Sequence, residues 1–95
     1  MGAYLLGIDI GTSACKAALF QENGTAIAQV TGEYSVYYPR PGWAEQDPDE
    51  WWHAVCIAVR DVLAISGVES AQIAGVGVDG QSWSAIAVDR AGDVL

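Results

Sequence analysis

The chain has 95 residues, of which 52% are hydrophobic and 17% charged, and its formal net charge is −8. This length allows one domain at most, and the apolar fraction excludes a disordered chain. Twelve acidic residues against four basic ones argue against a nucleic-acid partner, because neutralising many phosphates requires a Lys and Arg surface. A nucleotide ligand is not excluded, since backbone N–H groups and a metal ion can hold a small phosphate.

The cysteines and the first residues bear on the cellular setting. Cys15 and Cys56 lie at no spacing typical of a metal or redox motif, and both fall in apolar patterns. We therefore expect two buried free thiols in a reduced, cytoplasmic setting. The first residues lack the cationic region of a signal peptide, and no apolar run approaches the ~20 residues that span a bilayer. We expect a soluble protein with no membrane partner.

The first third of the chain predicts an antiparallel meander. Residues 4–10 form a short apolar run that ends at Gly-Thr-Ser, and residues 15–20 form a second candidate strand. Asn23-Gly24 is a strong hairpin signal between apolar runs, so residues 25–32 are the expected third strand. Residues 33–46 then predict a loop whose aromatic side chains pack against something, with its tyrosines covering a sheet edge.

A helix is predicted after this loop. Asp47 is the expected N-cap, Pro48 suits the first helical position, and Glu50 is placed to complete a capping box. The apolar stripe includes Trp52, while adjacent helical positions diverge by about 100°, so Trp51 is expected to face elsewhere. Gly67 is the expected stop. His53 has no second ligand in view and is expected at the solvent boundary.

The remaining segments predict a parallel strand at residues 73–78, a turn at 79–84, another strand at 85–88 and a turn at 89–93. A strand reached through a helix is typically parallel to an inner strand. The predicted class is therefore α/β, with a mixed sheet, an antiparallel meander, one main helix and a following parallel strand. The pattern alone fits several α/β folds.

One constellation could carry phosphate chemistry. Asp9 at the end of a strand can hold a hydrated Mg²⁺, and Gly11 lets the backbone approach an anion. The N–H and hydroxyl groups of Thr12 and Ser13 can donate to phosphate oxygens, and Lys16 can supply a positive charge. The alternative is an ordinary hairpin with a Ser/Thr turn. The chain has neither GxxxxGK[ST] nor GxGxxG, so a Walker-type or dinucleotide fingerprint is excluded.

The residues from Asp9 to Ser13, with Lys16, resemble the first phosphate motif of the sugar kinase, Hsp70 and actin superfamily. Three further stretches resemble FGGY carbohydrate kinases of the xylulokinase and glycerol kinase kind. They are the hairpin that follows the motif, residues 42–48 together with Trp51-Trp52, and residues 75–81. This resemblance implies a ribonuclease-H-like (actin-like ATPase) fold. It also implies that residues 1–95 are an incomplete amino-terminal part of the first domain, without the ATP-binding second domain.

The resemblance further implies ATP-dependent phosphorylation of a sugar or polyol hydroxyl. Asp9 would bind Mg²⁺ through water, Gly11, Thr12 and Ser13 would line the γ-phosphate position, and Lys16 matches a basic position of the motif. The general base of the family lies beyond residue 95, so the piece alone is expected to be inactive. Asp79 and Asp89 are therefore interpreted as turn residues.

Gln81, Ser82 and Trp83 are the expected acceptor-binding residues. Xylulokinases typically have Gly-Gln-Met-His-Gly at this place and glycerol kinases Asn-Gln-Arg-Glu-Thr, whereas this chain has Gly80-Gln81-Ser82-Trp83-Ser84. Trp83 either stacks on a sugar or packs near the cleft. A ketopentose such as xylulose is favoured, because glycerol loses support with the missing Arg-Glu pair. By the same analogy, Trp43, Glu45 and Gln46 are candidates to brace the loop on the substrate side.

Two further expectations concern alternatives and partners. The same fold could instead belong to a non-catalytic relative that binds sugar or nucleotide as a sensor or scaffold. An acetate-kinase-like or Hsp70-like protein is disfavoured by residues 42–48 and by the position of Gln81. We expect a homo-oligomer, and we expect the isolated piece to self-associate through exposed strand edges.

Overall fold

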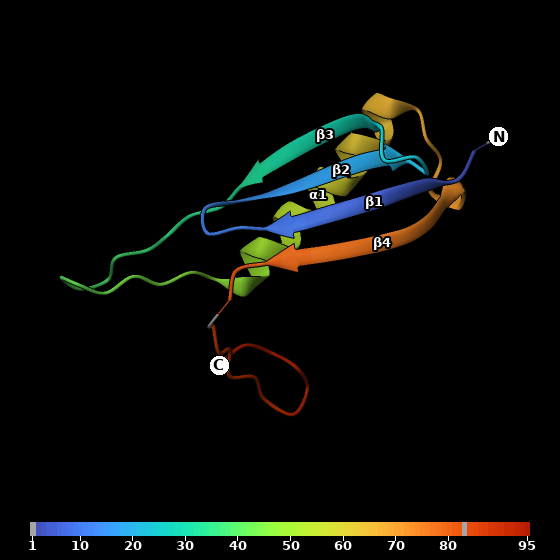
Figure 1. The fold of residues 1–95 in the computed structure, drawn as a ribbon. Coiled ribbons are helices and arrows are strands. Elements are labelled where there is room, and N and C mark those ends of the chain that lie inside the picture. Colours follow the sequence, from blue (N-terminus) through green and yellow to red (C-terminus); the bar gives the residue numbers. More distant parts are fainter. Residues whose placement is uncertain (1, 83) are drawn as a thin grey trace.

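The computed structural model describes residues 2–82 and 84–95. Its elements in chain order are β1 (Tyr4–Ile10), β2 (Ala14–Gln21), β3 (Ala26–Glu33), α1 (Pro48–Ser66), the short 3₁₀ helix η1 (Ser70–Gln72) and β4 (Ile73–Gly80). They form one four-stranded sheet in the order β3-β2-β1-β4, shown in Figure 1. β2 is antiparallel to both β1 and β3, whereas β4 is parallel to β1. The predicted mixed sheet, with a meander and a following parallel strand, is confirmed.

The hairpin between β2 and β3 forms where Asn23-Gly24 predicts it. Gly24 has φ +90°, a left-handed conformation that suits glycine. The Asn23 side-chain oxygen accepts from the Thr25 amide at 2.9 Å, and the Gln21 amide donates to the Thr25 carbonyl at 2.9 Å. These contacts fix the register of the meander.

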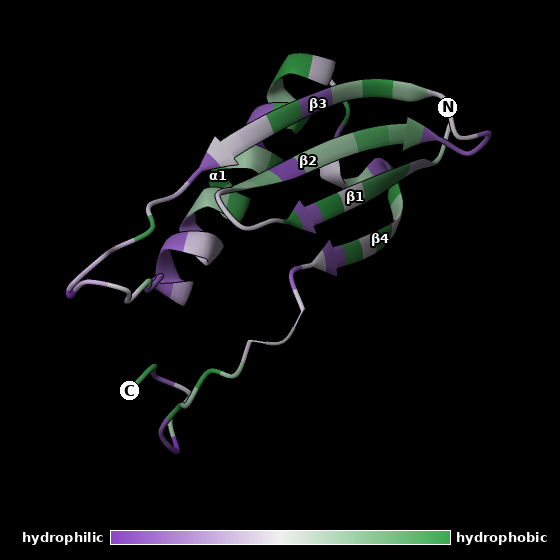
Figure 2. Cartoon of the chain, turned by 60° about the vertical axis from the view of Figure 1, so that its left-hand side comes forward, coloured by the Kyte–Doolittle hydropathy of each residue, from purple (hydrophilic) through white to green (hydrophobic). Residues whose placement is uncertain are grey.

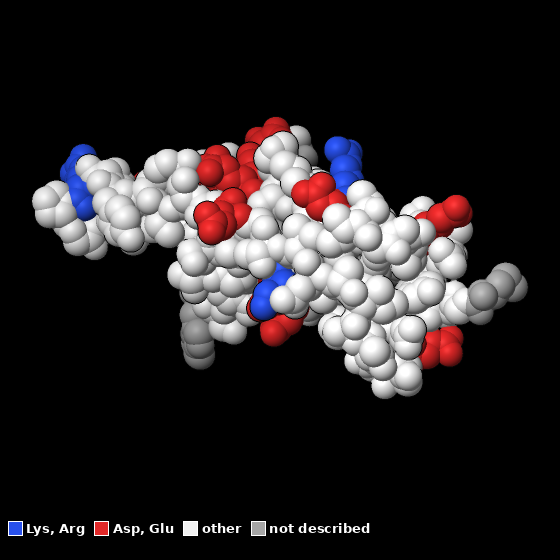
Figure 3. Space-filling view, turned by 90° about the horizontal axis from the view of Figure 1, so that it is seen from above, with Lys and Arg blue, Asp and Glu red and all other residues white. Residues whose placement is uncertain are grey.

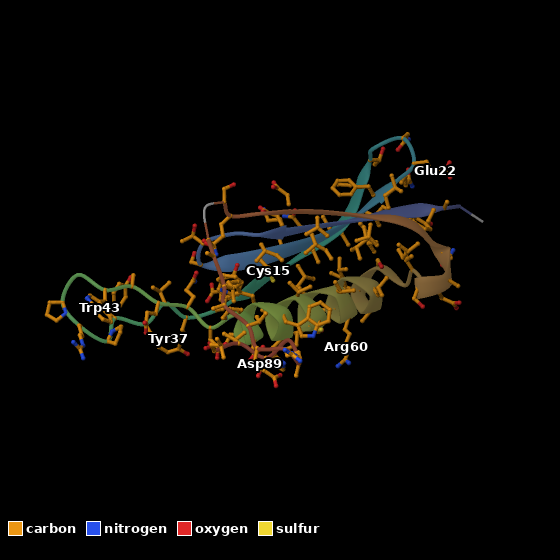
Figure 4. The ribbon with its side chains drawn as sticks, turned by 90° about the horizontal axis from the view of Figure 1, so that it is seen from below. Cys15, Glu22, Tyr37, Trp43, Arg60 and Asp89 are labelled. Carbon is orange, nitrogen blue, oxygen red and sulfur yellow. The ribbon has the colours of Figure 1, made fainter. Side chains whose placement is uncertain are left out.

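One face of the sheet is covered by α1, which packs mainly on β2 and β3 (Figure 2). Alternate residues of the strands meet the helix, as a pleated sheet with one buried face requires. Cys15 lies between the sheet and the helix, whereas Arg60 points away from the sheet (Figure 4). The buried core consists of Leu6, Cys15, Ala17, Leu19, Ala54, Val55, Ala58, Val62 and Val68.

The ends of α1 follow the predicted signals, with one difference. Asp47 accepts from the Asp49 amide at 3.0 Å, and the Gly67 amide donates to the Leu63 carbonyl at 3.0 Å. The expected capping box is wrong: the Glu50 carboxylate instead accepts from the Tyr37 hydroxyl at 2.6 Å. That hydroxyl reaches the helix from the preceding segment, so it competes for the Glu50 side chain.

The rotation of α1 also differs from the prediction. Trp52 was expected in the core, but 69% of its surface is exposed. Trp51 faces inward, where its ring centroid lies 6.3 Å from that of Tyr34. The buried stripe of the helix consists of Ala54, Val55, Ala58 and Val62, which leaves Trp52 outside it. His53 is exposed, as expected.

The helix approaches β3 most closely at Gly32. A Cβ atom built on Gly32 would lie 3.2 Å from the Ala54 carbonyl oxygen and 3.3 Å from the Cys15 sulfur. A side chain at this position would therefore push the helix away from the sheet. Gly32 is accordingly a packing residue in addition to its place in the strand.

Residues 35–46 form a projecting hairpin, which we call the arm (Figure 1). Tyr37 and Glu45 pair across it through two backbone hydrogen bonds of 2.7 Å. At its tip the Arg40 guanidinium lies 5.0 Å from the centre of the Trp43 ring. Tyr38 and Trp43 are 73% and 51% exposed, so the expectation that these aromatics pack or cover a sheet edge is wrong for them. Of the aromatic residues in the predicted loop, Tyr34, which precedes the arm, packs against the core.

The segment after β4 differs from the prediction as well. Residues 85–88 form no strand, and only an isolated bridge joins Val88 to Val94. The turn at 89–93 is confirmed: the Asp89 carboxylate accepts from the amides of Ala91 and Asp93, each at 2.9 Å. A strand requires a neighbour along its length, and the described residues offer none here.

Cys15 is buried and Cys56 half-buried, and both are free thiols. Among the described residues, no helix has the length and apolarity needed to cross a membrane. Figure 3 shows one face of the molecule, on which basic side chains lie apart from one another and acidic ones are more numerous.

Candidate phosphate-binding site

The predicted phosphate residues lie in the tight turn between β1 and β2. β1 ends at Ile10 and β2 begins at Ala14, so residues 11–13 form the turn, which we call the phosphate loop. The Gly11 amide donates to the Ala14 carbonyl at 2.9 Å and closes the turn. A Cβ atom at Gly11 would lie 3.0 Å from that carbonyl oxygen, so the turn requires glycine for close approach.

The three carbonyl groups of the phosphate loop are all engaged by residues beyond β2. The Tyr34 hydroxyl donates to the Gly11 carbonyl, and the Tyr34 amide donates to the Ser13 carbonyl at 3.2 Å. Gln46 Nε2 donates to the Thr12 carbonyl at 2.5 Å. The carbonyl oxygens are thus held toward β3 and the base of the arm.

The donor groups of the phosphate loop are left open. Thr12 and Ser13 are exposed, and within residues 2–82 and 84–95 no hydrogen bond uses their amides or hydroxyls. Successive free amides in a turn form a concavity that suits an anion. The loop therefore has the donors for phosphate oxygens without using a helix N-terminus.

Asp9 and Lys16 lie beside this loop on the face of the sheet that α1 leaves open. They are directly opposite each other on β1 and β2, and both are exposed. Both line a hollow of about 440 Å³ whose floor includes Gly7 and Gly77. A third charged residue, Asp79, lines the same hollow.

Asp79 is the residue whose place the sequence interpretation missed. It was expected in a turn, but β4 continues to Gly80 and places Asp79 in register with Asp9. The Asp79 carboxylate accepts from the Gly80 amide at 2.8 Å. The parallel pairing itself was predicted, but the predicted strand ended at Val78, whereas β4 continues to Gly80.

The donor set fits a hydrated Mg²⁺. In the described part of the chain no three His, Cys, Asp or Glu residues gather as a metal cluster. Mg²⁺ commonly keeps several waters and takes one or two carboxylates together with phosphate oxygens, and Asp9 is an exposed carboxylate of this kind.

Gln81 joins the predicted acceptor side to the phosphate loop. Its amide donates to the Ile10 carbonyl at 3.0 Å, and its Nε2 donates to Gln46 Oε1 at 3.4 Å. Thr12, Gln46 and Gln81 line a second hollow of about 400 Å³ together with Trp51 and Ser84. Ser82 is exposed next to Gln81. Trp83, the third predicted acceptor residue, lies outside the described residues.

Local sequence patterns did not indicate that Tyr34 and Gln46 contact the phosphate loop. Burial raises the pKa of the Tyr34 hydroxyl from its ordinary value of 10.0, and the nearby Cys15 and Asp9 raise it further. The hydroxyl is therefore protonated at neutral pH and acts as a donor to Gly11. Gln46 was expected to brace the substrate side, and it also contacts the phosphate loop.

Comparison with known proteins identifies the family of the chain. Residues 4–95 match the amino-terminal domain of the FGGY family of carbohydrate kinases. The chain belongs to the FGGY family of carbohydrate kinases. The family assignment rests on nearly the whole chain, including the phosphate loop, the arm and β4.

The names of similar FGGY proteins refer to different acceptors. A glycerol kinase of Symbiobacterium thermophilum is 40% identical over 86 residues, which are 90% of this chain and 17% of that protein. The crystal structure of a "xyloylose kinase" from Brucella ovis matches with a TM-score of 0.90 and 37% identity over 96% of this chain and 19% of that one. A gluconate kinase from Lactobacillus acidophilus matches with a TM-score of 0.90 and 29% identity over 100% of this chain and 19% of that one.

These matches confirm the predicted actin-like ATPase fold, of which the chain shows a partial domain. The chain spans less than a fifth of the length of these relatives.

Proposed function

We propose that this chain is the amino-terminal part of a longer ATP-dependent kinase that phosphorylates a hydroxyl group of a sugar or polyol. The observation that carries the proposal is the phosphate loop, whose carbonyls are engaged while the amides and hydroxyls of Thr12 and Ser13 are open. This is the donor arrangement that phosphoryl transfer needs, because the reaction depends mainly on positioning and charge stabilisation.

Each predicted residue then has a role in the proposal. Thr12 and Ser13 donate to oxygens of the γ-phosphate, and Gly11 allows the phosphate to approach the backbone. Asp9 holds Mg²⁺ through water, and the ion, when bound, neutralises phosphate charge. Lys16 lies opposite Asp9 on β2 and adds a positive charge beside it.

The acceptor is proposed to bind next to the end of β4. Gln81, Ser82 and Trp83 follow β4 directly, and Gln81 is hydrogen-bonded to Ile10, the residue before the phosphate loop. An acceptor held by these residues would therefore lie near the γ-phosphate. The general base and the remainder of the ATP site are assigned to the part of the longer protein outside residues 1–95, so these residues alone are expected to be inactive.

Xylulose is the first candidate acceptor, and glycerol and gluconate are the matched alternatives. The relatives include kinases named for all three compounds, so identity alone does not choose among them. The segment Gly80-Gln81-Ser82-Trp83-Ser84 lacks the Arg-Glu pair typical of glycerol kinases. It also lacks the Met-His pair typical of xylulokinases, so the preference for a ketopentose over glycerol rests on the missing Arg-Glu pair alone. The cytoplasmic location stays a prediction.

The test measures ADP release by the longer protein that contains this chain. Xylulose, other ketopentoses, gluconate, polyols and glycerol are compared, with Asp9→Ala as the inactive control. The proposal expects Mg²⁺-dependent turnover on one acceptor that is lost in the variant. Binding of sugar and nucleotide without turnover on any acceptor would instead identify a non-catalytic relative.

A further inference from the structure

The phosphate loop is held by two side chains from distant parts of the chain. Tyr34, which follows β3, lies 23 residues after Gly11, and Gln46, which precedes α1, lies 34 residues after Thr12. The two side chains satisfy the Gly11 and Thr12 carbonyls, and the backbone amide of Tyr34 satisfies the Ser13 carbonyl. A turn that only had to reverse the chain would need none of these contacts, because the bond from Gly11 to Ala14 already closes it.

The consequence follows from the geometry of the peptide bond. The described residues contain no cis peptide. In a planar trans peptide the C=O group of one residue and the N–H group of the next point in opposite directions. When Tyr34 holds the Gly11 carbonyl, the Thr12 amide must point away from Tyr34. When Gln46 holds the Thr12 carbonyl, the Ser13 amide must point away from Gln46.

We propose that Tyr34 and Gln46 are positioning residues, which orient the amides of Thr12 and Ser13 toward the phosphate by holding the carbonyls behind them. This inference rests on the proposed function and adds two residues to it. Neither side chain touches the phosphate. Without them the peptide planes can rotate, and a carbonyl oxygen turned toward the phosphate would repel it.

Gln46 has a second contact that joins the two halves of the site. Its Oε1 accepts from Gln81 Nε2 at 3.4 Å, while its Nε2 donates to Thr12 at 2.5 Å. One amide group thus bridges the acceptor side and the phosphate loop. Gln46 therefore affects both substrates, whereas the Tyr34 hydroxyl is hydrogen-bonded to the phosphate loop.

The test uses Tyr34→Phe and Gln46→Met in the longer protein, since each variant keeps most of the side-chain volume and removes the donor. The matched controls are Tyr37→Phe, which removes an exposed hydroxyl bonded to Glu50, and Gln72→Met, which removes a side chain bonded to the Glu69 amide. Both controls lose a hydrogen bond away from the phosphate loop.

Two quantities are measured: the Kd of a non-hydrolysable ATP analogue with Mg²⁺, and kcat with the KM values for ATP and acceptor. Tyr34→Phe is expected to weaken nucleotide binding and lower kcat/KM for ATP about ten-fold while leaving the acceptor KM within about two-fold. Gln46→Met is expected to produce the same loss for ATP and also to raise the acceptor KM. Both controls should match the wild type.

The outcomes separate the inference from the proposed function. If the wild type binds the analogue and turns over, but Tyr34→Phe and Gln46→Met behave like their controls, the positioning role is wrong. If the wild type neither binds the analogue nor releases ADP, the proposed function fails first, and the positioning role fails with it. Equal losses in KM for ATP and acceptor in Tyr34→Phe would indicate general destabilisation and would also contradict the inference.

Discussion

Asp9 and Asp79 lie opposite each other on the parallel strands β1 and β4, and both line the hollow on the open face of the sheet. The two carboxylates are not equivalent. The Asp79 side chain accepts from the Gly80 amide, whereas no hydrogen bond within the described residues uses the Asp9 side chain. Asp9 is therefore the carboxylate available for a cation, and Asp79 contributes negative charge beside it.

Asp9→Asn and Asp79→Asn should differ in their Mg²⁺ dependence. Asp9→Asn removes the proposed cation ligand, and we expect at least a ~100-fold rise in the Mg²⁺ concentration that gives half-maximal activity of the longer protein. Asp79→Asn removes only an exposed neighbouring charge, and we expect less than about a ten-fold change. A larger effect of Asp79→Asn would reverse these roles.

Gly32→Ala should destabilise the fold more than Gly77→Ala. The added methyl group at Gly32 meets the Ala54 carbonyl and the Cys15 sulfur, whereas a Cβ atom at Gly77 would meet nothing within 4 Å. We expect Gly32→Ala to lower the free energy of unfolding by about 1–3 kcal/mol, and Gly77→Ala by less than that, in urea denaturation. Equal losses would mean that the contact between α1 and β3 is looser than described.

Tyr34 should titrate above its ordinary value. Its pKa is raised from 10.0 by burial and by the nearby Cys15 and Asp9. Because the folded state favours the neutral hydroxyl, this contribution to stability is fully present below pH ~10 and is lost as the pH rises through the raised pKa. An ultraviolet absorbance titration of Tyr34→Phe should lack a component above pH ~10 that the wild type shows.

The control for this titration shows that the absorbance component above pH ~10 comes from Tyr34 in the folded chain and not from unfolded chains. Circular dichroism recorded over the same pH range identifies the point at which the fold is lost. Loss of a component below pH ~10 in Tyr34→Phe would contradict the raised pKa of Tyr34.

Residues 1–95 alone should self-associate through β4. This strand is the outer strand of the sheet on that side, and Val76 and Val78 are 59% and 67% exposed. An unpaired apolar edge is a template for another strand. Light scattering should show a mass that rises with concentration, and Val78→Lys should reduce it more than Ile27→Lys on β3. A monomer at all concentrations would contradict this prediction.

Local sequence signals predicted most of the elements because their causes are local. Asn23-Gly24 sets the hairpin, and Asp47, Pro48 and Gly67 set the ends of α1. The rotation of α1 was not predictable in this way, because Trp51 and Trp52 are equally apolar and the faces differ in their contacts with the sheet, such as that of Ala54 with Gly32. The strand expected at residues 85–88 failed for a related reason, since strand formation depends on a partner.

The candidate site likewise contains features with local causes and features that depend on contacts between distant residues. Asp9, Gly11, Thr12 and Ser13 lie within five residues, and their resemblance to a known phosphate motif made them candidates, although the local pattern also fits an ordinary hairpin. The contacts from Tyr34 and Gln46 to the phosphate loop join residues far apart in the sequence, and nothing in either local pattern indicates them. Asp79 became visible as a neighbour of Asp9 only through the parallel register of β4.

The most direct measurement of the central claim follows the γ-phosphoryl group itself. The longer protein is incubated with Mg²⁺, acceptor and ATP labelled at the γ-position, beside Asp9→Ala and a reaction without acceptor. We predict that the label appears in the sugar or polyol in step with ADP, and in neither control. Label that appears only as inorganic phosphate, or that stays in ATP with every acceptor, would contradict a carbohydrate kinase.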